Sequence, residues 1–177
     1  MNALAENPGA FSRRIGWLAL ACLLAAFVAF VAHSSGQLSA RVATHFDLHG
    51  KPNGWMTRAQ HLKFTLGVGV GTPVFILGVF AAVAKMKGWG LNIPHKAYWL
   101  APERQQATFD FLRGHSLWLA GLLVVFHAAL FESIVIANSQ SPALLSTSHT
   151  TGLIGGFLTL LLVWIVILLM RFRRPSA

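Results

Sequence analysis

Four long apolar runs constrain the fold of this chain more than any other feature of its sequence. Crossing the roughly 30 Å hydrocarbon layer of a bilayer takes about 20 helical residues. Because backbone polar groups in lipid must be satisfied within their own segment, continuous runs of this length are typical of helices rather than barrel strands. The runs cover residues 15–32, 64–84, 116–137 and 152–170.

Composition supports the same interpretation. The chain is 55% hydrophobic and only 11% charged, whereas an ordinary soluble domain is about 25% charged. One cysteine, Cys22, excludes an internal disulfide framework. We therefore predict an all-α fold, an integral membrane four-helix bundle formed as a single domain by residues 1–177, with the lipid bilayer as its first partner.

The distribution of charge predicts an orientation. The formal net charge is +9, but the basic residues flank the apolar runs, so we expect no nucleic acid partner. Ten of the 14 Lys and Arg residues lie before the first run, between the second and third, or after the fourth. The positive-inside rule then places both termini and the loop 85–115 in the cytoplasm, with the loop 33–63 outside. The oligomeric state stays open.

Local signals predict where two of the helices begin. Thr57 and Gln60 match the capping box, so the second helix should start near Thr57, ahead of its apolar run. Pro102 suits a first helical position, and Glu103 then lies in the positive first turn. In the outer loop, residues 42–48 alternate and favour an extended, ordered segment, and residues 50–54 have the chemistry of a turn.

Two loop segments, residues 42–55 and 92–104, resemble a family of small bacterial multi-pass membrane proteins of unknown function. The same domain forms the front part of immunity proteins against the sporulation-delaying toxin. The resemblance implies a bacterial cytoplasmic membrane location and a ligand-binding or structural role for the outer motif. The residues that match this motif are His45, Phe46, Asp47, Gly50, Pro52, Asn53, Gly54 and Trp55.

The outer histidines raise the possibility of a divalent metal as cofactor. If the segment is extended, His45, Asp47 and His49 point to one face, because strand side chains repeat every two residues. Imidazole and carboxylate suit zinc, nickel or copper, and His61 is available as a fourth ligand. The alternative is a polar, solvated loop face that binds no metal. We also expect His45 to be held against the bundle.

Two ionisable residues, His127 and Glu132, interrupt the third run. Such residues are costly in lipid and are functional candidates by default. They lie about 140° apart around a helix of 3.6 residues per turn, so they cannot share a face. We expect Glu132 to face the bundle interior or the underside of the outer loop, hydrogen-bonded there, and His127 to bond across helices.

The second run carries a small-residue pattern. Gly67 and Gly71 are four positions apart on one helical face. This spacing is typical of close contact between helices. We therefore expect a neighbouring helix to pack against these two glycines; the alternative is that this part of the helix serves as a hinge or a cavity wall.

The cytoplasmic loop offers a candidate docking segment for a soluble partner. Aromatic residues serve as anchors at interfaces, and charged residues lie at the rim. The alternative is an interfacial loop with its rings among the lipid headgroups. The candidate residues are Tyr98, Trp99, Pro102, Glu103 and Arg104.

No catalytic motif accompanies these features: G-x-S-x-G, H-E-x-x-H, C-x-x-C and the phosphate-binding glycine loop are all missing from the sequence. We expect a non-enzymatic protein for ligand sensing, immunity or signalling, acting through an extracytoplasmic peptide or a cytoplasmic regulator. One alternative is a small transporter or metal-handling protein using Glu132, His127 and the outer histidines. Another is a membrane enzyme using His45 and Asp47. A water-filled cavity reaching Glu132 would favour transport, and a dry bundle would favour binding.

Overall fold

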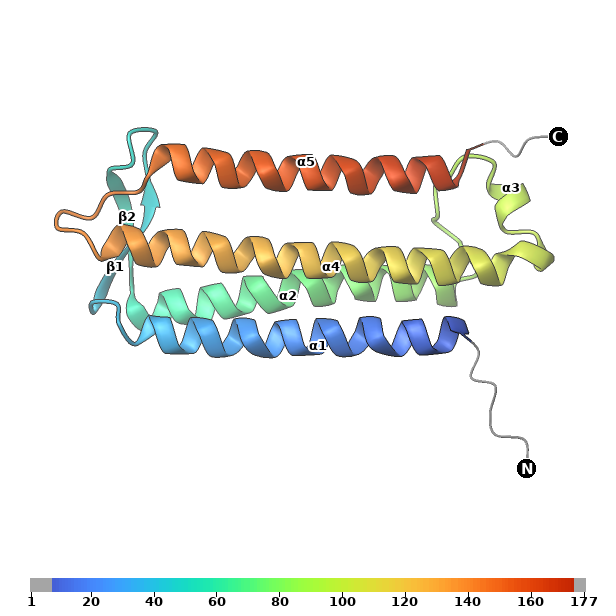
Figure 1. The fold of residues 1–177 in the computed structure, drawn as a ribbon, viewed down its shortest axis with the longest axis horizontal. Coiled ribbons are helices and arrows are strands. Elements are labelled where there is room, and N and C mark those ends of the chain that lie inside the picture. The colour runs from blue at the N-terminus through green and yellow to red at the C-terminus, as the bar shows by residue number, and fades with distance from the viewer. Residues whose placement is uncertain (1–7, 174–177) are drawn as a thin grey trace, which may run out of the picture.

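Four long helices, a β-hairpin and one short helix make up the fold (Figure 1). The computed structural model describes residues 8–173. Within that range, four helices are long and apolar enough to cross a membrane, in agreement with the four apolar runs. The elements in chain order are α1 (Pro8–Ser35), β1 (Arg41–Phe46), β2 (Pro52–Thr57), α2 (Arg58–Lys85), α3 (Lys96–Trp99), α4 (Pro102–Asn138) and α5 (Thr147–Arg171).

Both predicted helix starts are confirmed. Thr57 is the N-cap of α2, and its hydroxyl accepts from the backbone N–H of Gln60. The Gln60 side chain accepts from the backbone N–H of Thr57 at 3.0 Å, which completes the capping box. Helix α4 begins at Pro102 with Glu103 in its first turn. A capping box at α2 and a proline in the first turn of α4 therefore place both helix starts well outside the apolar runs.

The hairpin corrects an expectation of purely helical structure. Strand β1 lies within the predicted extended segment and pairs antiparallel with β2, with Ala43 opposite Trp55. The predicted turn at residues 50–54 is wrong, because Pro52 already belongs to β2. The chain reverses earlier, between Asp47 and Gly50, where the Gly50 N–H donates to the Asp47 carbonyl at 3.0 Å.

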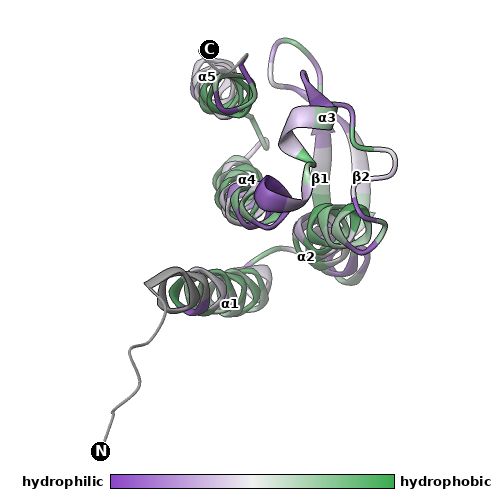
Figure 2. Ribbon diagram, turned by 90° about the vertical axis from the view of Figure 1, so that its right-hand side faces the viewer, coloured by the Kyte–Doolittle hydropathy of each residue, from purple (hydrophilic) through white to green (hydrophobic). Residues whose placement is uncertain are grey.

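Helices α1, α2 and α4 enclose the hydrophobic core (Figure 2). Helices α1 and α2 approach closely at Gly69, where an added Cβ would come within 2.3 Å of the Phe27 ring. Gly67 and Gly71 have open space instead, so the predicted contact at that pair is wrong. The buried core residues are Leu20, Phe27, Val31, Ala120, Val124 and Phe131.

Helix α5 lies outside this core. It packs along α4 and stands apart from α1 and α2 (Figure 2). None of its residues is buried, and large apolar side chains such as Leu158 and Leu162 are exposed. Its position therefore depends on contacts other than the core.

The two ends of the bundle carry different structures (Figure 1). The hairpin and the start of α5 lie at one end, which we call the hairpin end. The start of α1, helix α3 and the end of α5 lie at the other, which we call the α3 end. Arg174, one of the residues used to predict the orientation, lies outside the described residues.

Candidate functional site

At the hairpin end, Gly50 brings the hairpin against the segment that leads into α5. Its φ of +75° lies in the left-handed region that favours glycine. A Cβ at this position would come within 2.1 Å of the Leu145 carbonyl oxygen. The Gly50 carbonyl in turn accepts from the Leu145 N–H at 2.9 Å. Both backbone conformation and space therefore require glycine here.

The motif residues His45, Asn53 and Gly54 are explained by contacts within the hairpin. The Nδ1–H of His45 donates to the side-chain oxygen of Asn53. A Cβ on Gly54 would come within 2.9 Å of the His45 Cβ across the strand pair. His45 is exposed, so the expectation that it is held against the bundle is wrong. These three residues set the geometry of the hairpin itself.

Asp47 fixes the turn between the strands. Its carboxylate accepts from the backbone N–H groups of His49 and Lys51, each at 2.9 Å. The hydrogen bond from Lys51 is the main reason that the pKa of Asp47 lies below its ordinary value, with a further contribution from His49. The ionised carboxylate is therefore the form that closes the turn.

The predicted metal ligands do not come together. His45, Asp47 and His49 share no strand face, because β1 ends at Phe46 and the turn follows. His61 is buried within the bundle, where its ring stacks on Phe131 with centroids 5.7 Å apart. Among the residues that the structure describes, no three His, Cys, Asp or Glu side chains form a group that would hold a metal ion.

The outer surface of the hairpin carries apolar and cationic side chains. Leu48 at the turn is 90% exposed. Trp55 is nearly half exposed, with the Arg41 guanidinium 4.9 Å from its ring centroid. An aromatic ring beside an arginine is typical of binding surfaces. These three residues, Leu48, Trp55 and Arg41, form what we call the hairpin surface.

Asn138 attaches the hairpin to α4. The Ala43 N–H donates to its side-chain oxygen at 2.8 Å, and its amide nitrogen donates to the Ala43 carbonyl at 2.9 Å. This pair of bonds joins residues 95 positions apart in the chain. The sequence gives no signal for it, because an asparagine at the end of a helix has many possible partners.

The two ionisable residues of α4 are placed differently from the prediction. Glu132 is exposed on the outside of the bundle and has neither a hydrogen bond nor an ion pair among the described residues. His127 donates from Nδ1 to the Leu123 carbonyl of its own helix at 2.6 Å, rather than across helices. Because Glu132 is exposed, the expectation that it faces the bundle interior or the underside of the outer loop is wrong.

At the α3 end, the candidate docking segment folds partly inward. The Trp99 ring makes an edge contact with Phe172, the C-cap residue of α5, with centroids 5.7 Å apart. Its backbone carbonyl accepts from the Thr108 hydroxyl of α4 at 2.8 Å. The Arg104 guanidinium lies 3.9 Å from the Tyr98 ring centroid. Of the five candidate residues, Tyr98, Pro102 and Glu103 remain exposed.

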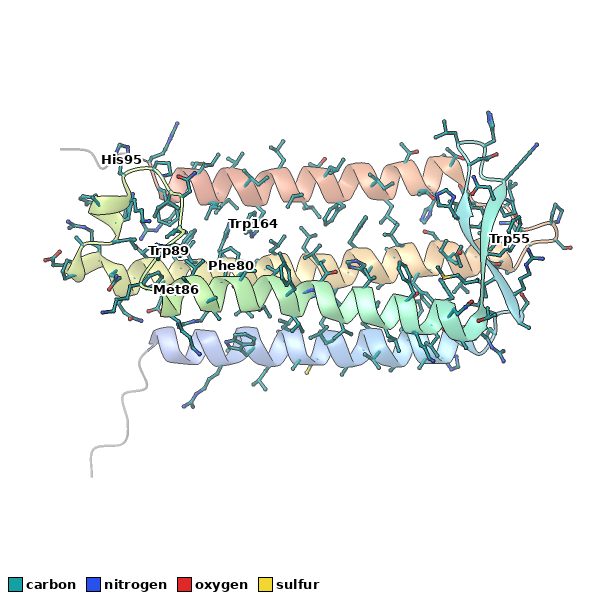
Figure 3. All side chains as sticks on the ribbon, turned by 180° about the vertical axis from the view of Figure 1, so that it is seen from behind. Trp55, Phe80, Met86, Trp89, His95 and Trp164 are labelled. Carbon is teal, nitrogen blue, oxygen red and sulfur yellow. The ribbon has the colours of Figure 1, made fainter. Side chains whose placement is uncertain are left out.

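His115 and Trp164 join α4 to α5 by two reciprocal hydrogen bonds. The His115 Nε2–H donates to the Trp164 carbonyl at 3.0 Å, and the Trp164 indole N–H donates to the His115 carbonyl at 2.9 Å. The two rings stack, with centroids 4.3 Å apart. Figure 3 shows Trp164 extending from α5 toward α4. Sequence reasoning missed this contact because the two residues lie 49 positions apart and neither residue type specifies its partner.

Arg171 continues this cluster at the end of α5. Its guanidinium lies 4.5 Å from the Trp99 ring centroid and 5.4 Å from that of Phe111. Phe111 also stacks on His115, with centroids 5.1 Å apart. Aromatic and cationic contacts from α3, α4 and α5 therefore meet at this end. We call these residues the aromatic cluster: Trp99, Phe111, His115, Trp164, Arg171 and Phe172.

A comparison with known families finds a match over part of the chain. Residues 20–66 are similar to a domain of unknown function, DUF1648. The matched segment includes most of α1, the whole hairpin and the start of α2, but not the segment 92–104. No curated protein and no solved structure matches the chain.

Proposed function

We propose that this is a non-enzymatic multi-pass protein of a bacterial cytoplasmic membrane, which binds an extracytoplasmic ligand at the hairpin and passes the binding signal to its cytoplasmic end through α5. The four apolar helices and the charge asymmetry of the loops support the membrane placement. In this orientation the hairpin end lies outside and the α3 end faces the cytoplasm.

One observation carries the proposal: the hydrogen bonds that join α5 to the rest of the protein lie toward its two ends, and between them Phe157 stacks on Phe126 of α4, with ring centroids 4.0 Å apart. At the hairpin end, Leu145 bonds to Gly50, and the Thr147 hydroxyl donates to the Leu48 carbonyl at 3.4 Å. At the α3 end, α5 joins the aromatic cluster. Between these ends it buries no residue. A helix held in this way moves as a unit when one end is displaced.

The hairpin surface supports the choice of a peptide or other amphipathic ligand. Leu48 and Trp55 offer apolar contact area, and Arg41 lies beside the indole ring. Because the Leu48 carbonyl accepts from Thr147, a ligand that displaces the turn also displaces the start of α5. At the other end, the exposed Tyr98 and Glu103 are available to a cytoplasmic regulator.

The membrane placement is tested by cysteine labelling in intact cells. We expect an impermeant reagent to label Lys51→Cys in the hairpin and to spare Lys96→Cys in α3. The native Cys22 is replaced by Ser in both variants. Labelling in the opposite order would overturn the orientation.

The coupling is tested with Gly50→Ala, measured by amide hydrogen exchange in the full-length protein. The added methyl would collide with the Leu145 carbonyl and strain the backbone. We expect faster exchange at the first turn of α5 and also at Tyr98 and Trp99 of α3. Gly152→Ala is the matched control, because its Cβ has open space within a helix. A change confined to the hairpin end would refute the transmission.

A further inference from the structure

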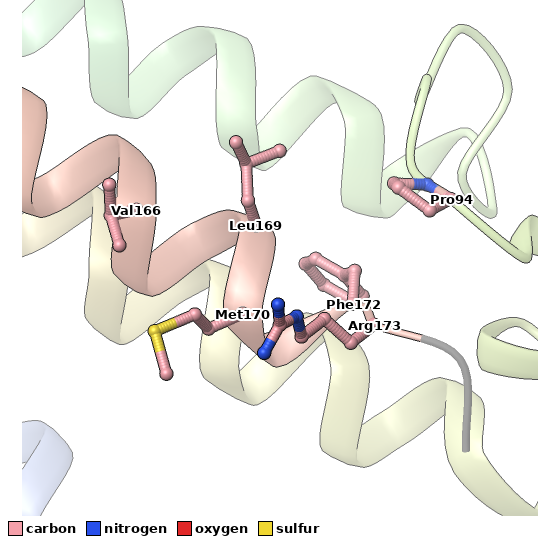
Figure 4. A pocket seen from close by; sticks show the side chains of 6 residues that line it. All are labelled: Pro94, Val166, Leu169, Met170, Phe172 and Arg173. Carbon is pink, nitrogen blue, oxygen red and sulfur yellow. The ribbon is translucent and has the colours of Figure 1, made fainter. Parts of the chain in front are cut away.

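A pocket lies at the α3 end, between the last turns of α5 and the loop that leads into α3 (Figure 4). Its volume is about 460 Å³. One part of the lining is apolar and comes from residues within the fourth apolar run. The rest comes from two residues just beyond that run and from Pro94 in the loop before α3. The lining residues are Val166, Leu169, Met170, Phe172, Arg173 and Pro94.

Positive charge marks the outer part of the pocket. Figure 4 shows the Arg173 guanidinium turned toward Met170. The Arg173 side chain has neither a hydrogen-bond acceptor nor a carboxylate partner among the described residues. None of the described lining residues is acidic. A guanidinium without a counter-ion favours an anion with several oxygens, because it has five donors in a planar fork.

The arrangement also selects the kind of anion. Val166 and Leu169 present hydrocarbon surface that a small, strongly hydrated ion would not use. Basic pockets beside membrane helices on the cytoplasmic side suit anionic lipid headgroups, with the acyl chain along the apolar helix surface. We propose that this pocket binds an anionic phospholipid, with an acyl chain along Val166 and Leu169 and the phosphate at Arg173. The proposal rests on the membrane placement above, but not on the coupling through α5.

The pocket also adjoins the aromatic cluster. Phe172 lines it and makes edge contacts with Trp99 and Phe111, with centroids 5.7 and 5.8 Å apart. Arg171, which lies over Trp99, is next to Phe172 in the chain. A lipid phosphate at Arg173 would therefore bind where α3, α4 and α5 meet, and it would stabilise the attachment of α5 at this end.

The test measures lipid retention by native mass spectrometry of the full-length protein in detergent. Phosphatidylglycerol and phosphatidylcholine with the same acyl chains are added in separate titrations. We expect phosphatidylglycerol to be retained preferentially, and Arg173→Gln to weaken its binding about fivefold, the size expected for one basic group near a lipid headgroup. Lys85→Gln removes one charge at the same end outside the pocket, and we expect it to retain the lipid as the unmodified protein does.

A second variant tests the apolar half. Leu169→Trp fills the pocket while keeping Arg173, and we expect it to weaken phosphatidylglycerol binding, with hydrogen exchange of α5 confirming that the helix remains folded. Equal retention of the two lipids, or equal loss in Lys85→Gln, would overturn the proposal. Displacement of the lipid by an equal concentration of inorganic phosphate would overturn it as well, since the acyl chain would then contribute nothing. Cysteine labelling at Lys51 and Lys96 reports separately on the membrane placement.

Discussion

Helices α1 and α5 are both apolar along most of their length, yet they are held in different ways. Helix α1 buries Leu20, Phe27 and Val31 in the core, whereas α5 buries no residue. In water, both would be driven into a core by the hydrophobic effect. In the proposed membrane placement, lipid solvates an apolar helix as well as protein does, so shape decides which helix packs closely.

One contact shows how the surface of α2 allows α1 to pack closely against it. Gly69 on α2 has no side chain, and the Phe27 ring occupies the space that a Cβ would take. No glycine of α5 makes a similar contact: Gly152, Gly155 and Gly156 all have open space. The core therefore depends on interlocking surfaces, and the position of α5 depends on a few directional contacts. Two predictions test this difference, and two more compare the hairpin and the exposed side of α4 with the core.

The largest effect is expected from Phe27→Ala. It leaves a cavity between α1, α2 and α4, and large-to-small changes at such sites cost about 3–5 kcal/mol of the free energy of unfolding. Leu162→Ala on α5 is the control, because Leu162 is 60% exposed, and changes at exposed sites usually stay within about 0.5 kcal/mol. Unfolding in detergent measures both, and equal losses would abolish the distinction between the helices.

A smaller, local effect is expected from Trp164→Phe. The substitution keeps an aromatic ring at this position but removes the hydrogen bond from the indole N–H to the His115 carbonyl, which lowers the free energy of unfolding by about 1 kcal/mol. Hydrogen exchange should increase at the end of α5 while the core of α1, α2 and α4 stays protected. Trp118→Phe is the matched control, because Trp118 is 78% exposed. Equal loosening in the two variants would show that the reciprocal bonds do not hold α5.

Acid should loosen the hairpin rather than the bundle. Because the folded state lowers the pKa of Asp47, its contribution is fully present above the pKa of the unfolded chain and is lost as pH falls through the lowered value. At pH values below the lowered pKa of Asp47, we expect the amide hydrogens of His49 and Lys51 to exchange several-fold faster than at neutral pH, after correction for intrinsic exchange rates. Asp47→Asn should remove the pH dependence. Unchanged exchange in acid would contradict the role of the carboxylate.

The smallest effect is expected from Glu132→Leu. Because its side chain is exposed and has no partner among the described residues, the substitution removes no packing contact, and the free energy of unfolding should fall by less than about 0.5 kcal/mol. The same unfolding assay measures it beside Phe27→Ala. A loss comparable with that of Phe27→Ala would mean that Glu132 takes part in packing after all.

The sequence predicted best the features that depend on neighbouring residues. Thr57 and Gln60 cap α2 through bonds across three positions, and Pro102 starts α4 through its own fixed geometry. The turn was placed wrongly because Pro52 and Gly54 are common in turns. The Asp47 carboxylate accepts hydrogen bonds from the backbone N–H groups of His49 and Lys51, and these bonds place the turn earlier in the chain.

The contacts between helices were not predictable in the same way. The helical repeat predicted the angle between His127 and Glu132. It did not predict which side of α4 packs against another helix, because the apolar run 116–137 has apolar residues on every side. His115 with Trp164 and Asn138 with Ala43 join residues 49 and 95 positions apart. A single sequence carries no information on such pairs, and their residue types are also common at sites without any partner.

The reciprocal bonds between His115 and Trp164 also determine how α5 can move. A slide along its axis by one helical turn, about 5.4 Å, would break both bonds and part Leu145 from Gly50 at the same time. A tilt away from α4 about one attached end breaks the contacts at the other end and separates the Phe126 and Phe157 rings, but it keeps the contacts at the first end. The structure therefore opposes a slide of α5 along its axis, and a tilt about one end costs less free energy.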